Sequence, residues 1–308
     1  MSQYVFGIDI GGTTVKCGLF SLAGEILDKW EIPTTLGSIL EDTAQTILDK
    51  AAAKNIAKDQ IKGIGVGVPG PVTADGVVIV GVNIGWPDPK DVKGEMEKLT
   101  GLPVAVANDA NVAALGEAWT GAAKGAKNAI MYTLGTGVGG GVIVDGKVIA
   151  GTHGAGGELG HATVILEGGT PCGCGKTGCL ETVTSATGIV RETKKYLAAN
   201  QDPSSLRDVE NLQAKDIFDA AKANDAVALK MVDQVGYYFG FAVSHTASAT
   251  DPEKIIIGGG VSKAGQILID AIQKYYRQFA FSSIQDTEFV IAELGNDAGI
   301  IGAASLAL

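Results

Sequence analysis

The sequence predicts an α/β fold of two domains, and three observations support this prediction. Short β-branched and apolar runs alternate with amphipathic stretches that have helical spacing. A unit of strand, glycine-rich turn and strand occurs at Tyr4 to Phe20 and again at Ala129 to Val144. The chain of 308 residues is long enough for two domains of ordinary size. We expect a small N-terminal domain over residues 1–108, on which a C-terminal helix at about 296–308 packs, and a larger domain over residues 109–295.

The first half of the chain reads as alternating strands and helices. A strand at Tyr4 to Ile10 is followed by a turn at Gly11 and Gly12 and by a second strand at Val15 to Phe20. The further elements expected are a helix at Ile39 to Ala53, strands at Ile64 to Val68 and Val104 to Ala107, and a helix at Ala110 to Trp119.

The second half repeats the theme and adds a long insert. The insert is rich in loops and glycine, and it runs from Gly151 to Thr182. Around it we expect a strand at Ala129 to Leu134, the turn GTGVGGG, a strand at Val142 to Val144, helices near Ser185–Ala199 and Ala226–Ala249, a strand at Lys254 to Ile257, and a helix ending at Phe279.

Composition and charge exclude several classes of protein. Apolar residues make up 46% of the chain and charged residues 19%, so the sequence has no signature of disorder. The net charge of −10 argues against a nucleic-acid or anionic-membrane partner, because such surfaces attract clustered Lys and Arg. The N-terminus has no basic region or long apolar stretch of a signal peptide. We therefore expect a cytoplasmic protein, whose four cysteines are thiols or metal ligands rather than disulfides.

Two glycine-rich stretches satisfy the pattern GxGxxG, which in a dinucleotide-binding fold is followed by a helix. Pro71 and the turn TADG follow the first stretch, and the strand pattern VIVDGKVI follows the second. The pattern GxxxxGK[ST] does not occur, so both the dinucleotide and the Walker-type interpretations fail. The two stretches comprise Gly65, Gly67 and Gly70, and Gly135, Gly137 and Gly140.

The remaining interpretation is a pair of hairpin turns whose backbone N–H groups bind phosphate oxygens. Ordinary hairpins that are rich in glycine are the alternative. Asp9 ends a buried strand just before the first turn, where a carboxylate needs a partner, and Mg²⁺ held through water would be that partner. Lys16 either reaches phosphate or is a solvated lysine at a strand end. The turns consist of Gly11, Gly12, Thr13 and Thr14, and of Gly135, Thr136 and Gly137.

Further motifs carry a resemblance to a known family. The stretch DIGGTTVK and both turns match the phosphate motifs of the hexokinase–actin–Hsp70 superfold. The stretches AVANDANVAALGE (105–117), GAGGELGHATV (154–164) and CGCGKTGCLE (172–181) resemble the ROK family of bacterial sugar kinases and repressors, over essentially the whole chain. This resemblance implies a hexokinase/actin-like (ribonuclease H-like) fold with a cleft between its two domains. Because ROK repressors carry a DNA-binding segment ahead of the kinase fold, the acidic chain that starts directly with that fold favours an enzyme.

The implied reaction is the phosphorylation of a hexose 6-hydroxyl by ATP with Mg²⁺. The match of NIGW (83–86) and of residues 105–117 to family members that act on glucose favours glucose over N-acetylmannosamine, whose kinases share the other motifs. A sugar-sensing regulator without turnover and a chaperone-like ATPase of the same superfold are the rival hypotheses. By analogy with the family we also expect a homodimer.

The resemblance also assigns roles to individual residues. It implies that Asp109 is the base that accepts the proton of the sugar hydroxyl. Without the resemblance, Asn108 and Asp109 would equally be a helix N-cap. The turn at Gly258, Gly259 and Gly260 resembles the adenosine site of the family. The residues implied to bind the sugar are Asn83, Asn108, Asp109, Glu158, His161 and Glu181.

A cysteine cluster predicts a structural zinc site. Cys172, Cys174 and Cys179 lie close together in the insert, after His161. Three thiolates and one imidazole make a closed tetrahedral set of structural type, and reduced free thiols are the alternative. His161 could bind zinc through one ring nitrogen while its other nitrogen faces the sugar. Cys17, in a strand, is expected to be a buried thiol.

Overall fold

The structure is a computed structural model that describes residues 3–308. The chain forms two compact units, and each is built from separate stretches of sequence. Unit 1 comprises the described residues up to Lys127 together with Gly141–Gly157 and Glu293–Leu308. Unit 2 comprises Asn128–Gly140 and Glu158–Ala292.

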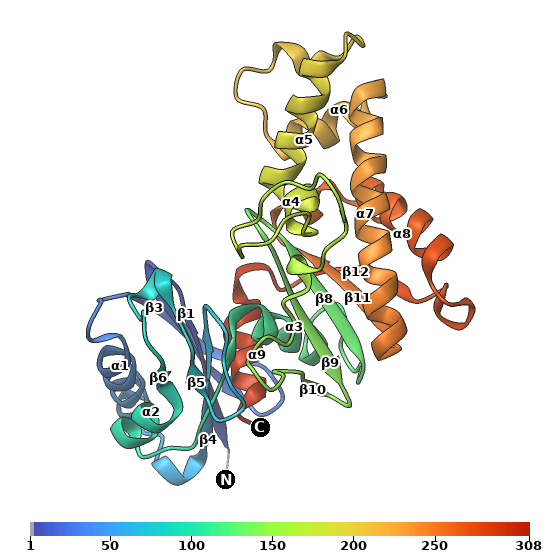
Figure 1. Ribbon diagram of the computed structural model, residues 1–308. Coiled ribbons are helices and arrows are strands. Elements are labelled where there is room, and N and C mark those ends of the chain that lie inside the picture. Colours follow the sequence, from blue (N-terminus) through green and yellow to red (C-terminus); the bar gives the residue numbers. More distant parts are fainter. Residues whose placement is uncertain (1–2) are drawn as a thin grey trace. The chain divides into compact units, whose positions relative to one another are not determined.

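Two five-stranded sheets form the framework, and their strand orders are β3-β2-β1-β4-β7 and β10-β9-β8-β11-β12 (Figure 1). In both sheets the third, second, first, fourth and fifth strands along the chain follow one another, which confirms the predicted internal duplication. The short strands β5 (Val77–Val78) and β6 (Lys90–Asp91) pair separately. The sheet strands are β1 (Tyr4–Ile10), β2 (Thr14–Ser21), β3 (Ile26–Pro33), β4 (Ile61–Val68), β7 (Val104–Asn108), β8 (Ala129–Leu134), β9 (Val138–Val144), β10 (Lys147–Val148), β11 (Lys254–Gly258) and β12 (Glu288–Ile291).

Helices connect the strands, and several begin at a capping side chain that accepts a backbone N–H, such as Asp225 before the longest helix. Short 3₁₀ helices, here labelled η, occur at Val82–Ile84 (η2), Leu159–His161 (η3), Gly260–Ala264 (η5) and Gly295–Asp297 (η7). The α-helices are α1 (Ile39–Ala53), α2 (Val92–Thr100), α3 (Asp109–Trp119), α4 (Glu181–Thr184), α5 (Ala186–Ala199), α6 (Ala214–Lys222), α7 (Ala226–Thr250), α8 (Gln266–Phe279) and α9 (Ala298–Leu306).

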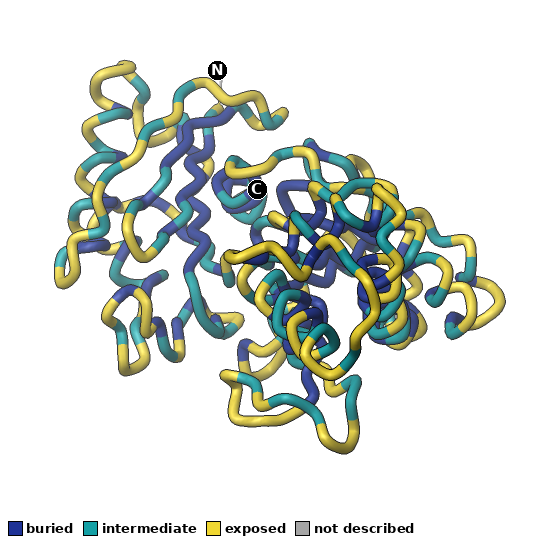
Figure 2. The backbone as a smooth tube through the Cα atoms, turned by 90° about the horizontal axis from the view of Figure 1, so that it is seen from above, coloured by how far each residue is buried: buried dark blue, intermediate teal, exposed yellow. Residues whose placement is uncertain are grey.

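The core of unit 1 follows from the two-residue period of its strands. Phe6 and Ile8 of β1 pack in one cluster with buried residues of α1 and α2. Val5, which points to the other face, packs with Ile300 and Ile301 of α9. Strands β1, β2 and β4 of this unit are buried along most of their length, whereas β3 has no buried residue (Figure 2). The sheet is therefore covered on both faces, and its edge where β1, β4 and β7 end is left to carry polar residues.

The core of unit 2 lies between its strands and four helices. Tyr132 of β8 and Ile257 of β11 belong to one cluster with buried residues of α5, α6, α7 and α8. Tyr132 is fully buried, and its hydroxyl lies 3.0 Å from the Thr246 hydroxyl, so its polar end is satisfied. Strand β8 and helix α5 pack in this one core, which therefore holds both the turn after β8 and the start of α5.

The compact units do not coincide with the two domains expected from the sequence. Helix α3, which lies beyond residue 108, belongs to unit 1. Its backbone meets α9 closely: a Cβ on Gly302 would lie 1.6 Å from the carbonyl oxygen of Val112. This close helix contact explains why α3 packs with the N-terminal sheet. Helix α9 lies in unit 1 as well.

Two local predictions are corrected by the structure. The second glycine-rich turn is shorter than GTGVGGG, because β9 already begins at Val138. Gly141 lies in this strand, where α3 approaches so closely that a Cβ would stand 2.6 Å from Cβ of Ala114. After Gly259 the chain forms the short helix η5 before α8 begins at Gln266. Among residues 3–308, no helix combines the length and the apolar character needed to cross a membrane.

Candidate functional site

Asp109 lies where β7 ends and α3 begins, and Asn108 is the N-cap of that helix. The Oδ1 atom of Asn108 accepts the amides of Ala110 at 2.9 Å and Asn111 at 3.3 Å, and its Nδ2 donates to the Gly70 carbonyl at 3.1 Å. The capping interpretation of Asn108 is thus confirmed.

Asp109 is an exposed residue whose carboxyl group is nevertheless largely surrounded by protein. Its Oδ1 accepts the amide of Ala110 at 2.8 Å. The protein around the carboxyl raises the pKa of Asp109 by desolvation, and hydrogen bonds from Ala110 and Asn108 oppose that effect. Asp109 is therefore a carboxylate with enhanced basicity, as a general base requires.

Asp9 and Lys16 are cross-strand neighbours in the β1–β2 hairpin. Burial raises the pKa of Asp9 to about 6, the Lys16 ammonium opposes this shift, and the Asp109 carboxylate adds to it. Lys16 Nζ lies 3.5 Å from the carbonyl oxygen of Asn296. Among residues 3–308, no protein cation lies within hydrogen-bonding distance of the partly buried Asp9 carboxyl. Its oxygens suit a Mg²⁺ ion that is held through water.

The first glycine turn leaves backbone donors available. Gly11 donates its amide to the Thr14 carbonyl at 2.9 Å, which closes the turn. In the part of the chain that the structure describes, the amides of Gly12 and Thr13 donate to no protein group. Asn83, on η2, lies beside this turn, because a Cβ on Gly12 would stand 3.1 Å from the Asn83 carbonyl oxygen. The structure thus brings Asn83 and the first glycine turn together in unit 1.

In unit 2 the four residues of the predicted zinc site lie together. The ligand atoms of the four predicted metal ligands all lie within 4.8 Å of one another. Cys174 Sγ lies 3.6 Å from Cys179 Sγ, close to the ~3.8 Å edge of a tetrahedron with zinc–sulfur bonds of ~2.3 Å. No disulfide joins these residues, so thiols are present to bind a metal ion. The ligand set is His161, Cys172, Cys174 and Cys179.

His161 faces the cysteines with one ring nitrogen and Glu158 with the other. Its Nδ1 lies 3.5 Å from Cys172 Sγ, and its Nε2 lies 3.7 Å from Glu158 Oε2. Glu158 precedes η3 and is exposed, whereas His161 is half-buried. A metal bound to Nδ1 would leave the proton on Nε2, where it can be donated to an oxygen acceptor.

Glu181 connects the cysteine cluster to the second glycine turn. Its Oε2 accepts the amide of Val138 at 3.0 Å, and its Oε1 lies 3.5 Å from Cys172 Sγ. Gly135 closes that turn by donating its amide to the Gly137 carbonyl at 2.9 Å. The turn and the metal-ligand loop are therefore joined through one carboxylate.

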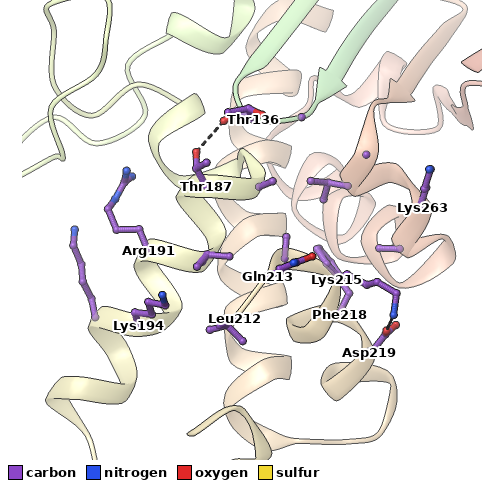
Figure 3. A pocket seen from close by; sticks show the side chains of 18 of the residues that line it. Thr136, Thr187, Arg191, Lys194, Leu212, Gln213, Lys215, Phe218, Asp219 and Lys263 are labelled. Atoms are coloured by element: carbon purple, nitrogen blue, oxygen red, sulfur yellow. Dashed lines mark hydrogen bonds and ion pairs between the residues drawn. The ribbon is translucent and has the colours of Figure 1, made fainter. Parts of the chain in front are cut away.

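A cavity of about 1150 Å³ opens beside the second turn in unit 2 (Figure 3). Gly135, Thr136 and Gly260, all predicted from the sequence, line it together with α5 and α6. Thr187 Oγ1 donates to the Thr136 carbonyl at 2.8 Å and holds the turn at one end of the cavity. Gly258 lies at the buried end of β11, and Gly259 has a φ of +82°, so they shape the approach to Gly260.

One wall of this cavity was not predicted from the sequence. Leu212, Gln213 and Phe218 line it, and the last of these lies on α6, which was not predicted. The apolar spacing of Ala214, Ile217, Phe218 and Ala221 indicates such a helix. Arg191, Lys194 and Lys263 add positive charge to the lining. The cavity thus combines apolar walls with cations, as suits an anion that carries an apolar ring.

The sequence matches the profile of the ROK family over residues 5–308. It is 49% identical to a glucokinase of Halalkalibacterium halodurans, with 97% of this chain and 93% of that protein covered. It is 38% identical to a glucokinase of Thermotoga maritima, with 98% and 96% covered. The solved structure of a ROK family glucokinase from Streptomyces griseus, in complex with glucose and AMPPNP, is similar with a TM-score of 0.72 and 33% identity, over 98% of each chain. The chain therefore belongs to the ROK family.

Proposed function

We propose that this protein is a glucokinase, which transfers the γ-phosphoryl group of ATP to the 6-hydroxyl of glucose. The observation that carries the proposal is the similarity to glucokinases over nearly the whole length of both chains. The Asp109 carboxylate at the start of α3, whose pKa is raised by desolvation, supports it independently. Phosphoryl transfer to an alcohol needs a positioned acceptor for the hydroxyl proton, and this carboxylate can be that acceptor.

Asp109 acts first in the proposed mechanism. Its Oδ2 accepts a hydrogen bond from the sugar 6-hydroxyl and takes the proton as the oxygen attacks the phosphoryl group. The bond from the Ala110 amide to Oδ1 holds the carboxylate in one orientation, so little reorganisation precedes the step. Asn108, the neighbour of the base, is assigned to an adjacent sugar hydroxyl.

Glucose selectivity is assigned to the remaining polar side chains of the implied set. Glu158 and Glu181 are acceptors for hydroxyl protons, and His161 Nε2 is a donor when a metal holds its other nitrogen. Asn83 is a further candidate beside the first phosphate turn. A sugar that lacks a matched hydroxyl would leave such groups unpaired, which discriminates far more strongly than size alone.

The nucleotide is assigned to both glycine turns and to the large cavity of unit 2. The free amides of Gly12 and Thr13 are donors for phosphate oxygens, and the turn at Thr136 opens on the cavity that would take the adenosine. Lys16 would move from the Asn296 carbonyl to a phosphate. Magnesium bound with ATP would neutralise charge on the transferring phosphoryl group, and Asp9 would hold its water ligands.

The cluster of His161 and three cysteines is proposed to bind a structural zinc ion. With four protein ligands, the metal would have no open position for substrate, and its role would be to hold the loop that carries Glu158 and Glu181. We place the enzyme in the cytoplasm, where ATP is supplied and thiols stay reduced. We also propose a homodimer, which size-exclusion chromatography with light scattering would detect.

An ADP-release assay across a panel of sugars tests the proposed function. We expect the highest kcat/KM for glucose, lower values for mannose and 2-deoxyglucose, and little turnover of N-acetylmannosamine. Equal or better turnover of N-acetylmannosamine would mean that glucose is not the preferred substrate, and it would leave the kinase mechanism intact. Sugar binding without ADP release would point to a regulator, and ADP release independent of every sugar to an ATPase.

A further inference from the structure

Glu117, near the C-terminal end of α3, is a fully buried carboxylate without a cation. Its side chain has no solvent exposure, and it forms no ion pair within residues 3–308. Its Oε1 accepts the amides of Glu293 at 3.0 Å and Leu294 at 2.9 Å. Its Oε2 accepts the amides of Ala122 at 2.9 Å and, more weakly, Glu293 at 3.2 Å. Three backbone donors therefore converge on one acceptor group.

Glu117 holds the segment that begins at Glu293, the first residue of the last stretch of sequence in unit 1. This segment continues directly into η7 and α9. At the start of α9 the backbone is in close contact with Asp9: a Cβ on Gly299 would lie 2.5 Å from Asp9 Oδ2. Between these points, Asn296 presents its carbonyl to Lys16. The segment that Glu117 holds thus touches both charged residues of the first hairpin.

We propose that Glu117 is a positioning residue that acts on Asp9, the proposed holder of the water ligands of Mg²⁺. By fixing the amides of Glu293 and Leu294, it sets where α9 begins, and the start of α9 in turn limits where the Asp9 carboxylate can lie. This inference rests on the proposed function, because it takes Asp9 as the group that holds the water ligands of Mg²⁺. Glu117 itself touches neither substrate nor metal.

The choice of residue supports a positioning role beyond packing. A buried carboxylate is expensive to desolvate, and an apolar side chain would fill the same space at lower cost. Two carboxyl oxygens together accept hydrogen bonds from three backbone amides, which an apolar side chain could not do. Glu117 lies two turns after Asp109 on the same helix, so one rigid element fixes both the base and the segment that bears on Asp9.

Glu117→Gln is the direct test. The amide retains one acceptor oxygen and turns an N–H₂ group toward at least one backbone N–H, so the segment loses part of its anchor. We expect kcat to fall about tenfold or more, since misplacement by ~1 Å can cost 10²-fold, and the free Mg²⁺ concentration for half-maximal rate to rise several-fold. The KM for glucose and the zinc content should change less than twofold.

Two measurements do not depend on turnover. Hydrogen exchange should quicken in the peptide that covers residues 293–299, and calorimetry should show weaker binding of ADP with Mg²⁺ but unchanged binding of ADP without it. Glu97→Gln is the matched control, because Glu97 also accepts a backbone amide, that of Val104 at 3.2 Å, in the same unit. This control should retain the Mg²⁺ dependence and kcat of the parent protein.

A second variant keeps the inference testable if Glu117→Gln does not fold. Gly299→Ala leaves the buried carboxylate untouched but places a methyl group against Asp9. It should likewise raise the free Mg²⁺ concentration for half-maximal rate. Unchanged Mg²⁺ dependence in either folded variant overturns the inference, even if thermal stability falls. Absence of glucose phosphorylation in the parent protein would instead refute the proposed function, and the magnesium-dependent binding of ADP would still decide the role of Glu117.

Discussion

The carboxylate of Glu181 accepts the backbone amide of Val138 at 3.0 Å, at the first residue after the second glycine turn. The other oxygen of the same side chain lies 3.5 Å from Cys172 Sγ. A side chain expected from the sequence to bind sugar is therefore also part of the support of the second glycine turn. The two roles can be separated by substitutions that differ in hydrogen-bonding capacity.

Replacing Glu181 by glutamine or by alanine should give different kinetic signatures. Glutamine keeps an oxygen for the Val138 amide, so the KM for ATP should stay within about twofold while the KM for glucose rises. Alanine leaves that amide unsatisfied, at a cost of about 1–3 kcal/mol, and should raise both constants and lower Tm. Steady-state kinetics with each substrate varied in turn measure this. Identical effects of both variants would mean that the contact with Val138 does not support the turn.

Removal of the proposed zinc should destabilise the protein and weaken glucose binding more than ATP binding. Cys172→Ala removes one of four ligands and the contact with Glu181, and strong chelators should have the same effect. Elemental analysis of reduced protein, thermal melting and calorimetric titration of glucose measure the outcome. Cys17→Ala is the control, since Cys17 is a buried thiol in β2, with its pKa raised to about 12 by burial, and lies outside the ligand set. Reduced protein that contains no zinc would refute the metal site.

Asp109→Asn should lower kcat by about 10²–10⁴-fold with little change in fold, because the amide cannot take the hydroxyl proton. Asparagine keeps an oxygen for the Ala110 amide, so α3 should begin as before. Circular dichroism and ADP binding check that the protein stays folded and competent. A variant with near-normal kcat would show that Asp109 serves only the helix start and that another group is the base.

The sequence predicted several regular elements with a strongly apolar face, although α6 was missed despite such a face. Strand β1 and helix α1 have the predicted bounds, because apolar residues recur in them with the period of a strand and of a helix. Strand β3 was missed because most of its residues are exposed or half-buried, so its pattern lacks a continuous apolar face.

The candidate site was predicted in part, and the limit has a physical cause. Motifs of adjacent residues, such as Asn108 with Asp109 or the cysteines of the insert, are visible along the chain. The bond of Glu117 to the Glu293 amide joins residues 176 positions apart, and the contact of Lys16 with Asn296 spans 280. Neither leaves a local pattern, because a backbone donor or acceptor can belong to any residue type.

Asp9→Asn should make the protein more stable and less active at neutral pH. The folded-state pKa of Asp9 is raised from 3.8 to about 6 by burial, so the carboxyl favours folding when protonated. Its stabilising contribution is complete below pH ~4 and is lost as the pH rises through about 6, since the folded state then has to hold a desolvated charge. Asparagine removes this charge.

We expect the free energy of unfolding of Asp9→Asn to exceed that of the parent by about 1–3 kcal/mol at pH 7.5, toward the lower end because the carboxyl retains some solvent contact, and by little at pH 4. Chemical unfolding at both pH values measures this difference, and an ADP-release assay should show that the Mg²⁺-dependent rate falls strongly. Equal stability of parent and variant at pH 7.5 would mean that Asp9 is not held at a desolvation cost, and that it has no need of a metal to offset one.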